Sequence, residues 1–238
     1  DIFEEDLVND GQILELLPQD VILPACSESP ELGADKILLK TSFFIDDLLK
    51  EFYKINKFYN LKSEKDLPGT LVAVLAPHTS AAVVGRIIGF SRTQGFFCNP
   101  MFHAATRRDC DGDEASVMLL MDALINFSKQ YLPDRRGSTQ DAPLVLTSKL
   151  VPAEVDDMVF DLDISWRYPL EFYDACEKYK MPWKIKIETI GDNLDKEDNF
   201  SVGYTHETKN INEGIRYSAY KEIPTMEEKV LGQMNLAE

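Results

Sequence analysis

The sequence predicts an α+β fold built around a small, strongly bent sheet or barrel. Short β-rich runs over residues 70–75, 83–90 and 95–98 are separated by glycine and proline, which interrupt strands and permit sharp bends. Apolar residues recur at helical spacing over residues 41–58, and a longer apolar run covers 115–130. At 238 residues, the chain can form one large domain or two small ones.

The segments before and after the β-rich runs differ in composition and in the structure that they predict. Residues 1–36 are acidic and rich in proline, so we expect a surface lead-in with at most a short helix. Residues 41–58 predict an amphipathic helix whose aromatic side chains belong to the core. The run 115–130 is apolar on nearly all sides, which predicts a buried helix in which Asp122 needs a partner.

The C-terminal third of the sequence predicts two more helices and one more strand. Pro169 is placed to begin a helix that ends near Tyr179. Residues 183–190 alternate between apolar and charged, which is typical of a half-buried strand. Thr225 and Glu228 have the spacing of a capping box that begins a terminal helix.

Composition limits the classes of function. The net charge is −16, from 25 basic and 41 acidic residues. For a free-standing protein this balance argues against a nucleic-acid partner, but the argument weakens for a piece of a longer chain. The chain begins at Asp1 without methionine, has no signal-peptide pattern and has no apolar run of roughly 18 residues. We expect an excised fragment of a cytoplasmic protein.

The four cysteines are scattered and form no Cys-x-x-Cys pair, and only three histidines are present. A zinc site or a disulfide framework is therefore not expected in this chain. The cysteines are Cys26, Cys98, Cys110 and Cys176.

The strongest chemical signal is a cluster of carboxylates at Asp109, Asp111 and Asp113. Like charges so close together repel one another unless a cation or protons intervene. Mg²⁺ prefers oxygen ligands and usually keeps several waters or substrate phosphates. Gly112 allows the backbone to turn sharply between the last two aspartates. The spacing predicts a divalent metal site.

Two other interpretations compete with the metal site. An EF-hand loop beginning at Asp109 would need glycine and glutamate where Glu114 and Leu120 stand, so that interpretation fails twice. An acidic turn that caps a helix, with Asp113 or Glu114 near the helix N-terminus, remains equally open from the residues alone.

Several stretches resemble the large subunits of archaeal family D DNA polymerases, in the expected order and from about residue 41 onward. These stretches are LAPHTSA (75–81), VGRIIGF (84–90), HAA (103–105), RR (107–108), CDGDE (110–114), SVMLL (116–120), NFS (126–128), YLP (131–133), DAPLVL (141–146), WRYPLEFY (166–173) and MEEKV (226–230).

This resemblance implies a double-psi β-barrel of the kind found in multisubunit RNA polymerases, with packed helices and a C-terminal α+β extension. It assigns residues 1–66 to the lead-in and amphipathic helix, 67–165 to the catalytic barrel and 166–238 to the extension. It also implies primed DNA and dNTPs as substrates. The implied protein partners are the rest of the large subunit with a second barrel, a small proofreading exonuclease subunit and a sliding clamp, with zinc modules lying outside this fragment.

The resemblance also implies roles for the residues of the site. Asp111 and Asp113, with Asp109 as a third ligand, would hold Mg²⁺ or Mn²⁺ for nucleotidyl transfer to a primer 3′-hydroxyl. The side chains that would contact phosphate are Arg107, Arg108, His103 and Arg86. For Arg107 and Arg108, simple charge balance of the aspartates is an equally open interpretation.

The chain departs from the family pattern near the site. The family usually has lysine where Thr106 stands, asparagine where Asp109 stands, and glycine and methionine where Ser138 and Gln140 stand. Losing a cation and gaining an anion could change metal affinity. Two alternatives to a polymerase site follow: a degenerate barrel that serves only as an assembly module, and a stand-alone acidic cation-binding domain. The isolated fragment is expected to be inactive.

Overall fold

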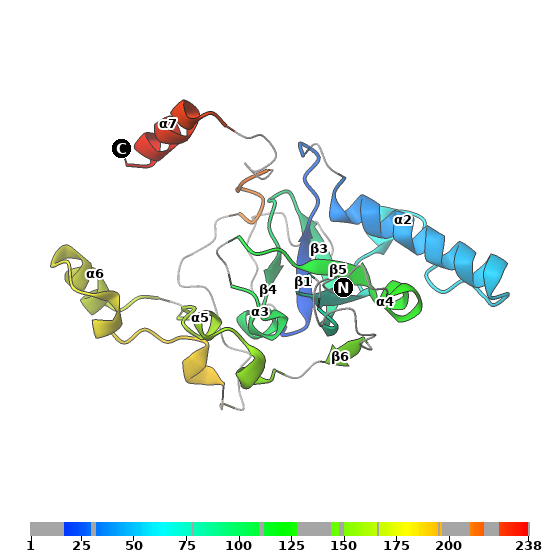
Figure 1. The fold of residues 1–238 in the computed structure, drawn as a ribbon, viewed down its shortest axis with the longest axis horizontal. Helices are drawn as coiled ribbons and strands as arrows, with labels where there is room; N and C mark the ends of the chain where they lie inside the picture. Colours follow the sequence, from blue (N-terminus) through cyan, green and yellow to red (C-terminus); the bar gives the residue numbers. More distant parts are fainter. Residues whose placement is uncertain are drawn as a thin grey trace, which may run out of the picture.

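The fold was obtained as a computed structural model, which describes residues 17–29, 32–77, 79–109, 112–127, 144–147, 150–165, 167–194, 196, 210–216 and 224–237. It is α+β, as the sequence predicts, with six strands in one sheet and several helices around it (Figure 1). No helix in these ranges has both the length and the apolar character needed to cross a membrane.

The sheet has the strand order β4-β1-β3-β2-β5, and β6 also pairs with β3. The strands are β1 (Asp20–Pro24), β2 (Leu71–Leu75), β3 (Ala81–Ser91), β4 (Phe97–Cys98), β5 (Ser116–Leu119) and β6 (Val145–Thr147). Pairing is parallel for β1 with β3 and for β3 with β6, and antiparallel for β1 with β4, β2 with β3 and β2 with β5.

Strand β3 is the centre of this sheet. Its residue Val83 pairs with Val74 of β2 and also with Thr147 of β6, so β6 must lie on the edge of β3 opposite β2. That edge also holds β1, which pairs with β3 from Arg86 onward. Two strands from distant parts of the chain therefore lie one after the other along the same edge of β3.

Some helices pack against this sheet, and others lie away from it (Figure 1). Their bounds are α2 (Ala34–Asp47), the π-helical turn η1 (Leu48–Phe52), α3 (Pro100–Thr106), α4 (Leu120–Asn126), α5 (Asp157–Phe160), α6 (Leu170–Glu177) and α7 (Met226–Ala237). Helix α2 packs on β1, β5 and α4. The main core lies between these elements and is made by Val21, Leu23, Leu38, Leu39, Leu67, Val72, Val74, Val83, Ile87, Cys98, Phe102 and Leu119.

Strand β1 corrects the expectation of a surface lead-in over residues 1–36. Val21 and Ile22 are fully buried, and β1 is hydrogen-bonded on both edges. Local sequence could not show this, because the partner strand β3 lies more than 60 residues later. The division of the chain at residues 66 and 165 stays a prediction.

The apolar run 115–130 is the second correction. Its first part is a strand, β5, which pairs with β2, and only then does the chain form the seven-residue helix α4. Asp122 is only half-buried, and its carboxylate accepts a hydrogen bond from Asn126 Nδ2 at 3.0 Å. Residues 128–130 of the predicted helix lie outside the described residues.

Two further predictions were wrong. The helix predicted over residues 41–58 instead begins at Ala34, and its helical part ends at Phe52. Its aromatic side chains are largely exposed, with Phe44 at 59% and Phe52 at 73%. Residues 183–190 form no strand beyond an isolated bridge between Thr189 and Asp163.

The predicted terminal helices are confirmed. Helix α6 follows Pro169, and α7 begins with the predicted capping box. In that box Thr225 N–H donates to Glu228 Oε2 at 2.7 Å, and Glu228 N–H donates to Thr225 Oγ1 at 3.2 Å.

Candidate metal and phosphate site

The acidic loop is held between two fixed elements, α3 and β5. Asn99 caps α3, since its side chain accepts a hydrogen bond from Met101 N–H at 2.8 Å, and Pro100 occupies the first turn. Helix α3 ends at Thr106, and the next residue, Arg107, has a left-handed backbone with φ 64°. On the other side, Ser116 pairs with Leu75 at the start of β5. Both ends of the loop are therefore anchored to the body of the protein.

Asp113 and Arg108 face each other across this loop. Arg108 Nη1 lies 3.2 Å from Asp113 Oδ2, and both side chains are about one-third exposed. Arg108 Nε also donates to the carbonyl of Glu114 at 3.3 Å. The guanidinium thus balances the charge of Asp113, which is one of the two roles considered for Arg108 from the sequence, and a partly exposed pair of this kind can exchange for a stronger anion.

His103 lies on α3 beside the same loop. Burial lowers the pKa of its imidazole below the ordinary value, while hydrogen bonding to the backbone of Asp109 and Arg108 and the negative charge of Asp109 and Asp113 act in the opposite direction. Burial is the larger influence, so the neutral imidazole is favoured. The fold therefore gathers His103, Arg108, Asp109 and Asp113 in one place.

Two predicted site residues are not placed at this loop by any described contact. Asp111 lies outside the described residues, as does Cys110. Arg86 is on β3, where its Nη2 and Nε donate to Asp20 Oδ1 at 2.6 and 3.0 Å. Asp20 is only 2% exposed, so Arg86 neutralises a buried carboxylate. Its contact with phosphate stays a prediction.

Thr106, where the resemblance expects lysine, is a buried residue. It is 4% exposed, and its Oγ1 donates to the His103 carbonyl at 2.6 Å. This hydrogen bond lies within the last turn of α3 and joins Thr106 to the backbone of His103. The threonine hydroxyl therefore has a structural role at the base of the loop, where the resemblance expects the cation of a lysine.

The donors at the loop suit a hard divalent cation. Asp109 and Asp113 offer carboxylate oxygens, and partial exposure of Asp113 leaves room for the waters that Mg²⁺ keeps. Within the described residues, no three histidine, cysteine, aspartate or glutamate side chains are placed to hold one metal ion. Because Asp111 is not among those residues, the three-aspartate cage stays a prediction.

Sequence reasoning missed two residues that support this region. Asp20 is the buried partner of Arg86, 66 residues away in the chain. Tyr59 Oη accepts a hydrogen bond from Met121 N–H at 3.1 Å, in the first turn of α4 just after β5. No local pattern could have found either contact, because both join segments that are remote in the sequence.

Comparison with known proteins gives the family. The family described as DNA polymerase II large subunit DP2, catalytic domain, matches residues 1–229. DNA polymerase II large subunits are similar at 52% identity in Archaeoglobus fulgidus and 51% in Pyrococcus furiosus, each over 98% of this chain. The large subunit of Nanoarchaeum equitans is 47% identical over the whole chain. The chain spans about a fifth of the length of these relatives, 20%, 18% and 20% respectively.

A family match over nearly the whole chain and identities near one half identify the family of the chain that carries the acidic loop. The chain belongs to the family of the DNA polymerase II large subunit and represents its catalytic domain.

Proposed function

We propose that this domain holds the catalytic Mg²⁺ of a DNA-directed DNA polymerase, which transfers nucleotides from dNTPs to a primer 3′-hydroxyl. The observation that carries the proposal is the acidic loop itself. It is anchored between α3 and β5, with Arg108 and His103 beside Asp113, in a chain that belongs to a polymerase catalytic-domain family. The double-psi barrel around this loop is part of the same proposal.

The chain's own residues divide the work of the reaction. Asp111 and Asp113 would bind the cations, with Asp109 as a third ligand, and Mn²⁺ would fit the same donors. When bound, the metal ions would activate the attacking hydroxyl and stabilise the leaving pyrophosphate. The remaining contribution is positioning and charge stabilisation, since little covalent chemistry falls to the protein in phosphoryl transfer.

Arg108 is the side chain best placed to bind a phosphate. Its guanidinium already faces an anion, Asp113, in a partly exposed ion pair. If Asp113 were engaged by a cation, the Arg108 guanidinium would be free to bind phosphate oxygens, which it matches with two parallel hydrogen bonds. Arg107, His103 and Arg86 are the further phosphate contacts in this proposal.

The proposed partners follow from the same assignment. They are primed DNA, dNTPs, the rest of the large subunit with its second barrel, a small proofreading exonuclease subunit and a sliding clamp, in a cytoplasmic complex. The active site would be completed by those parts, so the 238-residue chain by itself is expected to be inactive.

The test is primer extension by the full-length large subunit with its exonuclease subunit. The double variant Asp111→Ala with Asp113→Ala should lose activity by at least about a hundredfold, because charge stabilisation at the transferred phosphate is lost. The control is Glu171→Ala with Asp174→Ala, which removes two exposed carboxylates on α6. Unchanged extension by the first variant would show that the loop is not catalytic.

A degenerate, non-catalytic barrel is the second candidate, and the burial of Thr106 favours it. If the barrel only supports assembly, the wild-type complex will assemble but will not extend a primer at any Mg²⁺ or Mn²⁺ concentration. Extension by the wild type that the double variant lacks would exclude this candidate.

A further inference from the structure

We propose that the outer end of α2 binds an unpaired nucleic-acid strand, by stacking bases on its exposed aromatic rings and pairing phosphates with its lysines. This surface, the aromatic tip, comprises residues 50–60, and α2 carries it away from the sheet (Figure 1). The inference deepens the proposed function, on which the choice of DNA as the strand rests.

The aromatic tip exposes ring faces that a solitary domain would be expected to bury. Phe52 is 73% exposed, Phe58 is 59% and Tyr53 is 49%. The rings form edge-to-face pairs, Phe52 with Tyr53 at 5.1 Å between centroids and Phe58 with Tyr59 at 5.0 Å. Each base of a nucleic acid has a π-face, so such rings provide a stacking platform that accepts any sequence.

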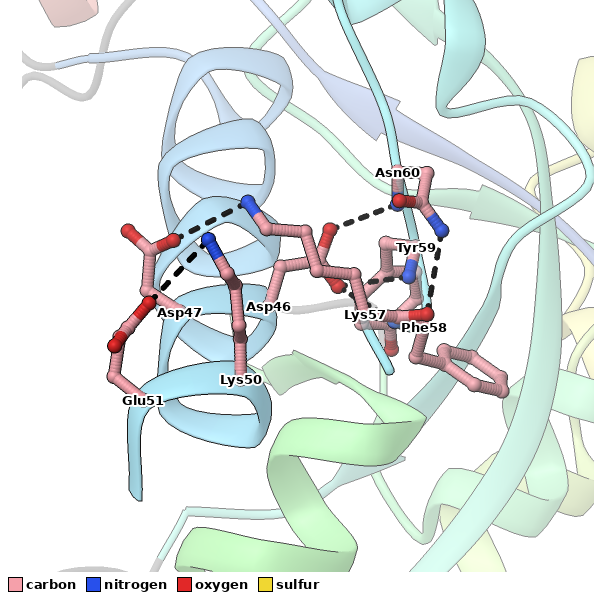
Figure 2. Close-up of polar contacts among 8 residues, drawn as sticks. All are labelled: Asp46, Asp47, Lys50, Glu51, Lys57, Phe58, Tyr59 and Asn60. Atoms are coloured by element: carbon pink, nitrogen blue, oxygen red, sulfur yellow. Dashed lines mark hydrogen bonds and ion pairs between the residues drawn. The ribbon is translucent and has the colours of Figure 1, made fainter. Parts of the chain in front are cut away.

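The backbone beneath these rings is held in one conformation. Asp46 is 2% exposed, and its Oδ1 accepts hydrogen bonds from Phe58 N–H and Tyr59 N–H, both at 2.9 Å, while Oδ2 accepts from Asn60 N–H at 2.8 Å (Figure 2). The Phe58 ring points away from α2 (Figure 2). Charge-assisted hydrogen bonds of this kind are strong, so the ring is presented without a large ordering cost on binding.

The charge around the rings is complementary to phosphate. The aromatic tip contains three lysines and one glutamate, a net charge of +2 in a chain whose net charge is −16. Lys50 pairs with Glu51 at 3.4 Å and Lys57 with Asp47 at 3.2 Å, and all four side chains are substantially exposed (Figure 2). Exposed pairs contribute little to stability, so phosphate can replace their carboxylates.

An unpaired strand fits this surface better than a protein or a duplex. Lysine is depleted in protein interfaces, whereas here lysines alternate with the aromatic residues. In a duplex the base faces are already stacked on one another, so exposed rings find no partner. Aromatic stacking combined with a basic track is the physical pattern of single-strand binding.

The test uses the full-length large subunit and a fluorescein-labelled oligothymidylate of about 20 nucleotides, with binding followed by fluorescence anisotropy. Loss of two stacking rings in Phe52→Ala with Phe58→Ala should weaken binding by at least about thirtyfold. Binding of a duplex of equal length should change less than about twofold. An oligouridylate of equal length tells whether the surface prefers DNA to RNA.

The matched control removes exposed aromatic residues elsewhere, with Tyr179→Ala and Trp183→Ala, which are 96% and 77% exposed. This control should bind the strand as the wild type does. Unchanged strand affinity in the Phe52 and Phe58 variant overturns the proposal. So does loss of association with another polypeptide while strand affinity is kept, since that outcome makes the aromatic tip a protein interface.

Failure of this inference can be separated from failure of the proposed function. Asp111→Ala with Asp113→Ala should abolish primer extension and leave oligothymidylate binding unchanged. If extension survives in that variant, the metal site is wrong, yet a loss of strand binding in the Phe52 and Phe58 variant still supports the aromatic tip.

Discussion

At the scale of single residues, Gly112 is the position where the acidic loop depends most on its backbone. Its φ is +116°, a conformation that L side chains rarely adopt, and a Cβ there would meet no atom within 4 Å. A substitution would therefore act through backbone strain alone. Gly69 has the same character, with φ +92° and open space around it, but lies at the start of β2.

We expect Gly112→Ala and Gly69→Ala each to lower the free energy of unfolding by about 1–3 kcal/mol. Only Gly112→Ala should also impair primer extension, because it displaces Asp113. Urea unfolding of the domain and extension assays of the intact subunit measure the two effects. Equal activity of the two variants would mean that the shape of the acidic loop does not matter for catalysis.

The residues of the candidate site could be predicted from the sequence only where neighbours in the chain are neighbours in space. His103, Arg108 and Asp113 lie within eleven positions, and the anchored loop brings them together. The pairing of Arg86 with Asp20 could not be predicted, because nothing near either residue indicates that β1 and β3 are adjacent.

At the scale of elements, the capping pattern predicted the structure correctly, whereas apolar periodicity did not. The capping box of α7 was predicted because both partners lie within one turn. The strand at 116–119 was mistaken for a helix because a short, mostly apolar run has no clear period to distinguish the two. The alternation over residues 183–190 did not yield a strand, since a strand also needs a partner with free edges.

The capping box of α7 makes a pH-dependent contribution to the stability of that helix. Hydrogen bonds from the backbone N–H and hydroxyl of Thr225 hold the pKa of Glu228 below its ordinary value of 4.5. Because the folded pKa is lowered, the stabilisation is present above pH 4.5 and is lost as the pH falls through the lowered pKa.

We expect the Thr225 amide resonance in NMR spectra to shift with a midpoint below 4.5 as the pH is lowered. The Glu228→Gln variant, which has no carboxyl group to titrate, should show no such shift. A midpoint above 4.5, or the same titration in the glutamine variant, would contradict the capping role.

At the scale of the whole molecule, the ion pair between Arg86 and Asp20 joins the N-terminal segment to the centre of the sheet. Arg86 and Lys57 have equally exposed side chains, 39% each, but their partners differ, since Asp20 is 2% exposed and Asp47 is 68%. Removing the arginine leaves a carboxylate that is buried beside β3 without its cation, whereas removing the lysine leaves one that water already solvates.

We therefore expect Arg86→Met to lower the free energy of unfolding by about 2–3 kcal/mol. Lys57→Met should lower it by less than about 1 kcal/mol. Urea denaturation followed by circular dichroism measures the free energy of unfolding of each variant. Similar losses in the two variants would show that the burial of Asp20 does not govern the strength of this contact.

The placement of β1 and β6 along one edge of β3 also affects how the chain acquires its structure during synthesis. The β2–β3 hairpin can form as soon as residue 91 is free, and β1 is already available by then. The first residues of β3, from Ala81 to Val83, keep unpaired backbone groups on one edge until Thr147 has been made. For more than 50 residues of translation this open edge is a site where another chain can add a strand, so aggregation of nascent chains competes with folding during that interval.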